Sequence, residues 1–297
     1  MGSYCEIWHT FPGLSCLMFC LLSGLSLYLC TRLNIGFMAA LFHDFVAILQ
    51  SFELGPVEWA LIMLCGILVG AAKTGLSGAA FIVVPTLAMI FGGKPSTGML
   101  LPMLIMGDIF AVSYYNRHTN WMYVLKPIPW AVAGVVIGVL VGNQVSGNVF
   151  TTLIAVTVIM GLILMVWQDR RRNHIVVPDY WWFSAIMGMI GGFSTMIGNS
   201  AGPIMSIYLL TMYLPKNIFI GTKAWFFMLI NLVKVPFHVF SWHTIDWRTF
   251  TFDLAVLPAL AIGAYIGVRV VRLIPEKGYR ILVIATTAVA CVVMLSG

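Results

Sequence analysis

The stretch Ile197-Gly198-Asn199-Ser200-Ala201-Gly202-Pro203 lies between two apolar runs that are each too short to cross a bilayer comfortably. About 123 positions earlier, Thr74-Gly75-Leu76-Ser77-Gly78 makes a similar Gly- and Ser-rich break. Such a break leaves backbone groups without helical partners, which hydrocarbon tolerates only where the break is packed in protein or lines a wet cavity. Two breaks at corresponding places in two halves of a chain indicate a binding site in a transporter.

The composition predicts a multi-pass protein of the cell membrane, either inner or plasma membrane. Apolar residues make up 61% of the chain, charged residues 9%, and the mean hydropathy is +0.98. Soluble proteins are about 45–50% apolar and about 25% charged. The net charge of +6 does not indicate a nucleic-acid partner, because the basic residues lie in short loops, most densely at Arg170–Arg172. Positive loops mark the cytoplasmic side of a membrane protein.

The reactive residue types argue against an enzyme, a metal site or a cofactor. The six cysteines contain no Cys-x-x-Cys pair and lie mostly in apolar runs, so neither a disulfide framework nor a zinc site is expected. No helix presents His-Glu-x-x-His, paired aspartates or a Ser/His/Asp set at a plausible depth. An intramembrane enzyme therefore remains only a less favoured alternative.

Residues 1–56 form an N-terminal extension ahead of the repeated part of the chain. Residues 11–29 predict one retained membrane segment rather than a signal peptide, because no Lys or Arg precedes them. Residues from about 35 to 50 carry an apolar stripe at helical spacing, which fits either an interfacial helix or a helix packed against the bundle.

From Val57 onward the chain reads as two sets of helical membrane segments. The predicted segments are 57–73, 78–92, 97–115, 123–143 and 149–168, then 181–197, 200–214, 218–238, 249–272 and 279–296. A full span needs about 20 residues. Because 78–92 and 200–214 are shorter, we expect them to be the short arms of broken hairpin helices near the membrane midplane.

The two sets match each other in a sustained register. At an offset of 123, Ser77 corresponds to Ser200, Gly98 to Gly221, and Asp108 to Asn231. The loop charges then require an odd number of crossings per set. The sequence therefore predicts an all-α polytopic fold of two inverted-topology repeats, 57–168 and 180–297, joined by a cytoplasmic linker at 169–179.

Each break is followed by the start of a short helix, for which Ser77, Asn199 or Ser200 is a suitable N-cap. Two helix starts near the midplane present free N–H groups and the positive ends of helix dipoles, which favour an anion. The alternative is that the glycines only allow helices to pack closely.

Few ionisable residues lie inside the apolar segments. Lys73 adjoins the first break, and Lys234 and Asp108 lie within predicted spans, where each charge costs a few kcal/mol unless paired or hydrated. Either lysine could complement an anion, although Lys234 could also reach a membrane surface. Asp108 could pair with a lysine, carry a coupling proton, or serve only as a buried hydrogen-bonding group. Lys223 could add positive charge on the path into the site.

The predicted substrate-binding set combines the two breaks with nearby polar residues. Its members are Lys73, Thr74, Gly75, Ser77, Gly78, Gly198, Asn199, Ser200, Gly202, Thr222, Asn231 and Lys234, with Asp108 as the proton-coupling candidate.

Several strings resemble the sulfite exporter TauE/SafE family over about residues 57 to 296. In the second half they are Gly198-Asn-Ser-Ala-Gly-Pro203, Tyr208-Leu-Leu, Phe219-Ile-Gly-Thr222 and Asn231-Leu-Val-Lys-Val-Pro236. In the first half, Gly75-Leu-Ser-Gly78 with Val84-Pro85 is similar to the family's first repeat. The resemblance implies a polytopic inner-membrane carrier of sulfite, sulfonates such as sulfoacetate, or related organic anions, coupled to a proton gradient.

The leading hypothesis is a secondary transporter of small anions that works by alternating access in the lipid bilayer. The alternative within transport is a proton-coupled carrier of a cation or neutral metabolite that depends on Asp108. The sequence leaves open the substrate, the direction of transport, the coupling ion and the oligomeric state, including a homo-oligomer.

Overall fold

The computed structural model describes residues 42–76, 83–147, 149–150, 152–153, 156, 180–273 and 275. All regular secondary structure in these residues is helical, which confirms the predicted all-α class. The chain divides into two compact units, Met1–Glu53 and Leu54–Gly297. In the first unit, residues 42–50 form a helix.

Several predicted features lie outside the described residues. They are the segment at 11–29, most of 149–168, the linker at 169–179, the segment at 279–296, and the site residues Ser77 and Gly78.

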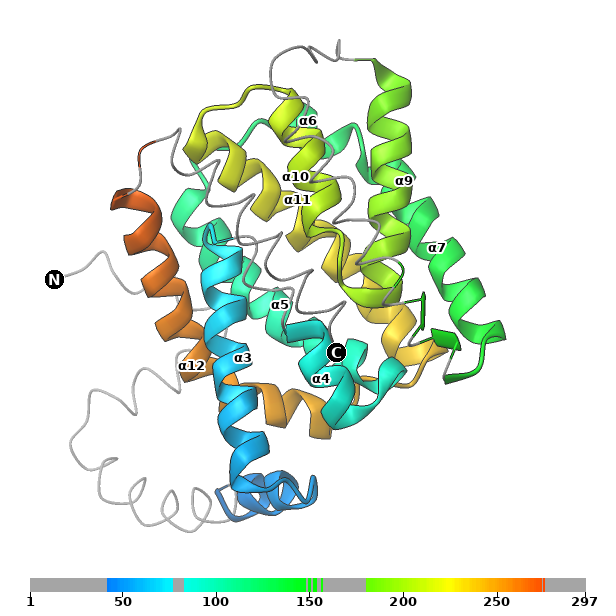
Figure 1. Ribbon diagram of the computed structural model, residues 1–297, viewed down its shortest axis with the longest axis vertical. Helices are drawn as coiled ribbons and strands as arrows, with labels where there is room; N and C mark the ends of the chain where they lie inside the picture. Colours follow the sequence, from blue (N-terminus) through cyan, green and yellow to red (C-terminus); the bar gives the residue numbers. More distant parts are fainter. Residues whose placement is uncertain are drawn as a thin grey trace, which may run out of the picture. The chain divides into compact units, whose positions relative to one another are not determined.

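Within the described part of the chain, five helical stretches are long and apolar enough to cross a membrane. They are α3 (Pro56–Lys73), α5 (Gly93–Tyr115), α6 (Trp121–Leu125) with α7 (Ile128–Gln144), α11 (Lys216–Pro236) with the π-helical turn η3 (Phe237–Ser241), and α12 (Trp247–Leu273). Figure 1 shows these helices with the short helices α4 (Val83–Phe91) and α10 (Gly202–Thr211) and with α9 (Trp181–Gly198).

The helix ends follow local sequence signals. At α3, Pro56 occupies the first turn, where its missing N–H is not needed, and the Glu58 carboxylate accepts a hydrogen bond from the Gly55 N–H. The predicted span 123–143 is divided into α6 and α7 around Lys126 and Pro127, a break that the sequence analysis did not predict. The predicted short segment 200–214 is shorter still as α10.

In two helix pairs, a glycine on one helix lies directly against the backbone of the other. In the pair of α3 and α12, a Cβ at Gly70 would overlap the backbone of Leu260. In the pair of α7 and α9, a Cβ at Gly192 would overlap the carbonyl of Ala131. Small residues allow helices in membranes to approach so closely, and therefore the glycine stripes do contribute to packing.

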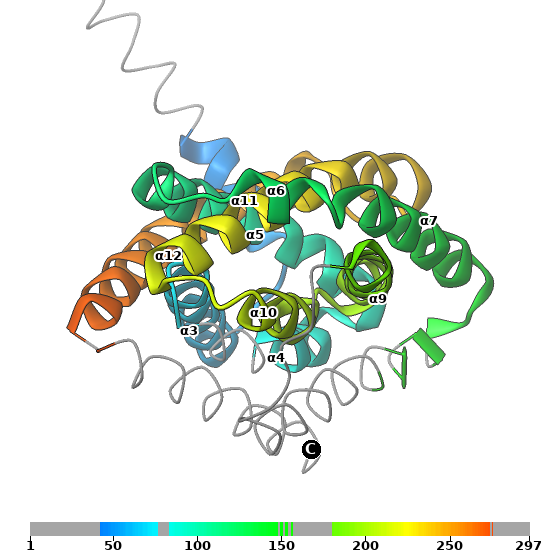
Figure 2. The same ribbon diagram turned by 90° about the horizontal axis from the view of Figure 1, so that it is seen from above.

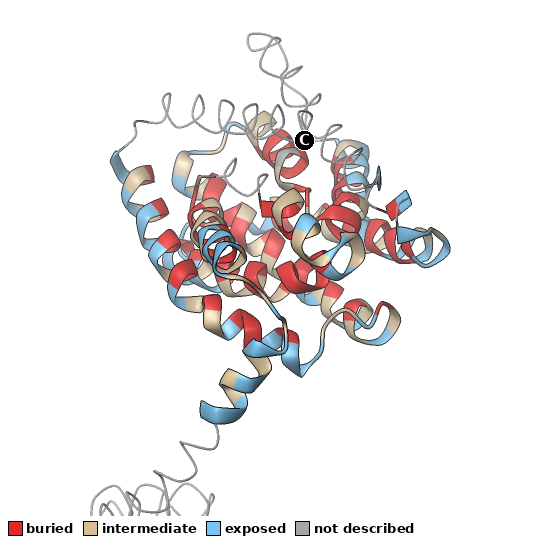
Figure 3. Ribbon diagram, turned by 60° about the horizontal axis from the view of Figure 1, so that its bottom comes forward, coloured by how far each residue is buried: buried red, intermediate tan, exposed pale blue. Residues whose placement is uncertain are grey.

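Between these pairs, α5 packs against α11 (Figures 1 and 2). Both helices are buried over much of their length, with Leu101 and Met103 on α5 and Phe226 and Ile230 on α11 almost fully inaccessible. The buried residues lie on inward-facing surfaces and the exposed ones on the outside (Figure 3). The polar residues Thr97 and Asp108 on α5 and Thr222, Asn231 and Lys234 on α11 are therefore buried in protein.

Candidate functional site

The site is built around an ion pair between Lys73, the last residue of α3, and Asp108 on α5. Nζ of Lys73 lies 2.8 Å from Oδ1 of Asp108, whose side chain is 0% exposed, while that of Lys73 is 13% exposed. Nζ also lies 4.6 Å from the centre of the Phe227 ring on α11. Buried charges offset their loss of hydration only in such close pairs. The contact therefore ties the end of α3 to the middle of α5.

Asn231 on α11 joins this pair to a second charged residue. Its Nδ2 donates to Oδ2 of Asp108 at 2.7 Å, and its Oδ1 lies 3.5 Å from Nζ of Lys234. Asp108, Asn231 and Lys234 are all 0% exposed. The amide thus bridges a buried carboxylate and a buried ammonium.

Lys234 is held by neutral oxygens. Its Nζ donates to Thr195 Oγ1 at 3.2 Å and to Oδ1 of Asn199 as well as Asn231. Among the described residues, no carboxylate lies within 4.0 Å of this ammonium. Its amino group is therefore surrounded by neutral dipoles, with no acid beside it among these residues.

The break between α9 and α10 positions Asn199. This residue ends α9 in the left-handed conformation, with φ of 50°, which asparagine tolerates better than most residues. Its Nδ2 donates to the Thr97 carbonyl on α5 at 3.3 Å. The predicted capping of α10 by Asn199 or Ser200 is wrong, since the turn at Asn199 shifts the N-cap to Ala201, which offers no side-chain acceptor.

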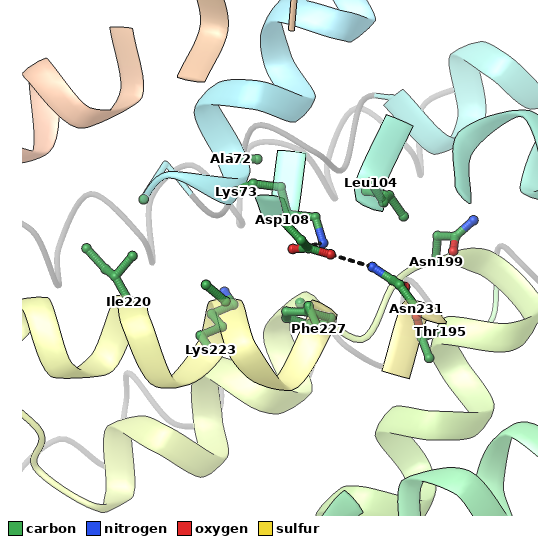
Figure 4. A pocket seen from close by; sticks show the side chains of 13 residues that line it. Ala72, Lys73, Leu104, Asp108, Thr195, Asn199, Ile220, Lys223, Phe227 and Asn231 are labelled. Carbon is green, nitrogen blue, oxygen red and sulfur yellow. Dashed lines mark hydrogen bonds and ion pairs between the residues drawn. The ribbon is translucent and has the colours of Figure 1, made fainter. Parts of the chain in front are cut away.

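A cavity of about 60 Å³ lies where these elements meet (Figure 4). Its lining residues are Ala72, Lys73, Gly75, Leu104, Asp108, Thr195, Asn199, Gly202, Ile220, Lys223, Ala224, Phe227 and Asn231. A cavity needs a volume of at least about 10–15 Å³ to hold one water molecule. This cavity therefore has room for a few waters or a small ion.

The charges around the cavity are unequal. Lys73 and Lys223 line it, and three of its lining residues hold the ammonium of Lys234. Nζ of Lys223 donates to Ser206 Oγ at 2.8 Å. Asp108 is the one carboxylate among the lining residues. When they are protonated, three lysine amino groups around a single carboxylate produce a positive potential inside a region of low dielectric constant, which favours an anion.

The structure brings together many members of the predicted set. Lys73, Gly75, Asn199, Gly202 and Asn231 line the cavity, as does the proton-coupling candidate Asp108. Lys234 reaches lining residues through its hydrogen bonds.

Other members of the predicted set lie apart from the lining. Thr74 donates to the carbonyls of Gly70 at 3.0 Å and Ala264 at 3.1 Å, which secures the end of α3. The Thr222 hydroxyl accepts from the Asn120 N–H at 2.9 Å. Ser200 is buried with its hydroxyl 3.0 Å from that of Ser194, and the neighbouring Gly198 is the last residue of α9.

Thr195 and Phe227 line the cavity although nothing in the sequence singled them out, and Lys223 lies in the lining rather than only on the path to it. A signal was present on α11. Residues 220, 223, 224, 227 and 231 recur at the spacing of one helix face. A lysine and an asparagine on a face that also carries the buried Phe227 point to a polar site between helices.

These observations define a class: a multi-pass helical membrane protein with a charged cavity between its spanning helices. The described residues contain no group of three or more His, Cys, Asp or Glu side chains that could hold a metal ion.

The family model described as sulfite exporter TauE/SafE matches residues 33–294, and the chain belongs to this family.

Two curated relatives carry the name probable membrane transporter protein MamO. The protein from Magnetospirillum gryphiswaldense is 26% identical over 217 residues, which cover 60% of this chain and 34% of the relative. The protein from Paramagnetospirillum magneticum is 24% identical over the same coverage. The chain thus spans about a third of the length of the curated relatives it matches. No solved structure matches it significantly.

Proposed function

We propose that this chain is a secondary transporter of small anions, with sulfite, a sulfonate such as sulfoacetate, or a related organic anion as substrate. The observation that carries the proposal is the buried cavity surrounded by Lys73, Lys223 and Lys234 with Asp108 as its carboxylate. Membership in the TauE/SafE family and the name of the two relatives, probable membrane transporter protein, support it.

The substrate would bind between Lys73 and the group of neutral side chains that holds Lys234. The Thr195 hydroxyl and the Asn199 amide are already ordered by contacts with protein. Such preorganised groups lose little conformational freedom on binding. At Gly202, in the first turn of α10, the chain lacks a side chain, so that an anion can approach backbone N–H groups.

We further propose that the fold consists of two inverted repeats that rock around the cavity. Two features support this. First, α3 packs along α12 as α9 packs along α7, and α3 and α9 run in opposite directions in Figure 1. Second, Asp108 and Asn231, which correspond at an offset of 123, meet in a hydrogen bond. Binding sites at repeat interfaces are typical of secondary transporters.

Coupling to protons would use Asp108. An anion that binds the ammonium of Lys73 competes with the carboxylate only 2.8 Å away. A carboxylate separated from its cation inside a poorly hydrated cavity is stabilised by taking up a proton. Anion binding and protonation would then favour each other. In this account the chain performs no chemical step and needs no cofactor, and its surroundings are the lipid bilayer.

Counterflow in proteoliposomes tests the proposal. Purified protein is reconstituted into vesicles loaded with unlabelled sulfite, sulfoacetate or acetate, and entry of the labelled anion is followed. We expect saturable exchange of at least one of these anions that protein-free vesicles lack. If none exchanges while a cation or neutral solute does, the carrier of a cation or neutral metabolite replaces this proposal.

A further inference from the structure

A second buried carboxylate, Asp253, lies away from the cavity. It is on α12, six residues after Trp247, and its side chain is 0% exposed. The helix is one of those suited to span a membrane. Asp253 is not among the residues that line the cavity.

The carboxyl group faces neighbouring helices rather than the outside. Val256, three residues further along, approaches Gly66 of α3 closely, and Leu260 lies against Gly70. Positions three and seven residues apart share a helix face. On the adjacent position, Phe252 stacks on Trp59 with ring centres 5.3 Å apart. Asp253 therefore lies on the face of α12 that packs against α3, and α5 packs against α12 as well.

In the part of the chain that the structure describes, neither oxygen of Asp253 has a hydrogen-bond partner. Among the described residues, no Lys, Arg or His nitrogen lies within 4.0 Å of it. Most titratable groups on α12, α3 and α5 are engaged elsewhere or lie at the helix ends. At the two ends of α12, Asp246 and Arg248 are exposed, while Arg269 and Arg272 lie over the rings of Tyr265 and Tyr114. On α3 and α5, Glu58 binds the Gly55 N–H, Lys94 donates to the Gly142 carbonyl, Tyr115 donates to the Thr74 carbonyl, and Lys73 pairs with Asp108. Cys65 is a buried thiol in the middle of α3.

The two protonation states of this carboxyl differ greatly in free energy here. An unpaired ionised carboxylate buried in a membrane helix costs several kcal/mol. The protonated form leaves only one O–H donor unpaired, which costs less. The neutral acid is therefore favoured in this conformation, although its unpaired O–H group does not stabilise the packing. The ionised form would be favoured only in a conformation in which water reaches the carboxyl group.

We propose that Asp253 is a proton-binding site: its carboxyl holds a proton in this conformation and releases it to water when α12 moves away from α3 and α5. The step breaks the O–H bond of the carboxyl and transfers the proton to water, with no other reactant. Release on one side of the membrane and uptake on the other would add a coupling site to the carrier.

This site is distinct from the ion pair in the cavity. Gly66 lies opposite Val256, and Lys73 follows Gly66 by seven residues, whereas Asp253 precedes Val256 by three. Since α3 and α12 run parallel, the two sites are separated by about ten residues of helix, or roughly 15 Å along the axis. Asp253 thus acts without contact with the substrate. Its coupling role rests on the proposed function, but its protonation does not.

Infrared spectroscopy of the full chain in lipid tests the protonation directly. At neutral pH we expect a C=O band of a protonated carboxyl that is lost in Asp253→Asn and that disappears reversibly as the pH is raised. The control Asp246→Asn changes an exposed carboxylate that caps the start of the same helix, and it should retain the band. A band that is equal in wild type and Asp253→Asn would overturn the proposal, as would one that never titrates.

Flux measurements test the coupling. We expect Asp253→Asn to lose accumulation driven by a pH gradient while it keeps anion counterflow, and Asp246→Asn to keep both. Unimpaired accumulation by Asp253→Asn would contradict the coupling role. If the wild type exchanges no anion at all, the proposed function fails, and the infrared titration still decides whether Asp253 binds and releases a proton.

Discussion

Nδ2 of Asn231 donates a hydrogen bond of 2.7 Å to Oδ2 of Asp108, although the two residues are 123 positions apart. The same offset relates the two breaks and the glycines at 98 and 221. Corresponding positions of two halves therefore meet at one point between α5 and α11. In the proposed two-repeat fold, a site forms at this meeting point, where one repeat supplies the acid and the other its amide counterpart.

Asp108→Asn should destabilise the protein and abolish transport. The substitution leaves the ammonium of Lys73 in its buried position without a carboxylate. Removal of one partner from a buried pair costs about 3–5 kcal/mol. Thermal unfolding of the purified protein should show a clear fall in the midpoint.

The double variant Lys73→Met with Asp108→Asn separates the two effects. It removes both charges and should recover much of the lost thermal stability but none of the anion flux. A double variant that is no more stable than Asp108→Asn would argue against the ion pair.

Thr195→Val should weaken substrate binding more than turnover. Valine has nearly the shape of threonine but removes one acceptor of the Lys234 ammonium, at 3.2 Å. We expect the apparent KM for the transported anion to rise roughly tenfold, equivalent to about 1.4 kcal/mol, while the maximal rate changes little.

A matched control is Thr251→Val. Thr251 is also a buried helical threonine, but its hydroxyl donates to the Trp247 carbonyl on its own helix, away from the cavity lining. Its KM should stay at the wild-type value. Equal changes in both variants would show that the effect of Thr195→Val is general loss of packing.

Two adjacent glycines on α9 should respond in opposite ways to alanine. At Gly192 an added Cβ would overlap the Ala131 carbonyl of α7, whereas at Gly191 its nearest neighbour is Met205 Sδ at 3.6 Å. Gly192→Ala should lower the stability by about 1–3 kcal/mol through overpacking. Gly191→Ala should be neutral or add up to about 1 kcal/mol through helix propensity.

Thermal unfolding of the two variants side by side checks this prediction. Equal stability of Gly191→Ala and Gly192→Ala would contradict the close approach of α7 and α9.

Much of the fold could be predicted from hydropathy and register. The length of each apolar run predicts that a membrane segment exists there. The predicted segments 57–73 and 181–197 differ from α3 and α9 by a single residue at one end. The division at Lys126 and Pro127 was missed because both residues lie inside a continuously apolar run, where a single charge and a proline look like ordinary interruptions.

The site was only partly predictable for a different reason. Lys73, Asp108 and Lys234 stand out because charges are rare in membrane segments. Thr195 carries no such signal, since threonine is common in these helices and its role arises only when α9 faces α11. The predicted N-cap of α10 was wrong because the left-handed turn at Asn199 displaces the helix start. This turn is held by contacts with Thr97 and Lys234, which are distant in the sequence.

The most direct test of anion transport compares wild type, Lys234→Ala and Lys216→Ala in proteoliposomes under a pH gradient. Lys216 lies on the same helix, but its ammonium donates to the Val271 carbonyl and is outside the cavity lining. We predict saturable uptake of sulfite, sulfoacetate or a small carboxylate by the wild type and Lys216→Ala, and its loss in Lys234→Ala. Full uptake by Lys234→Ala, or no anion uptake by the wild type, would contradict the account.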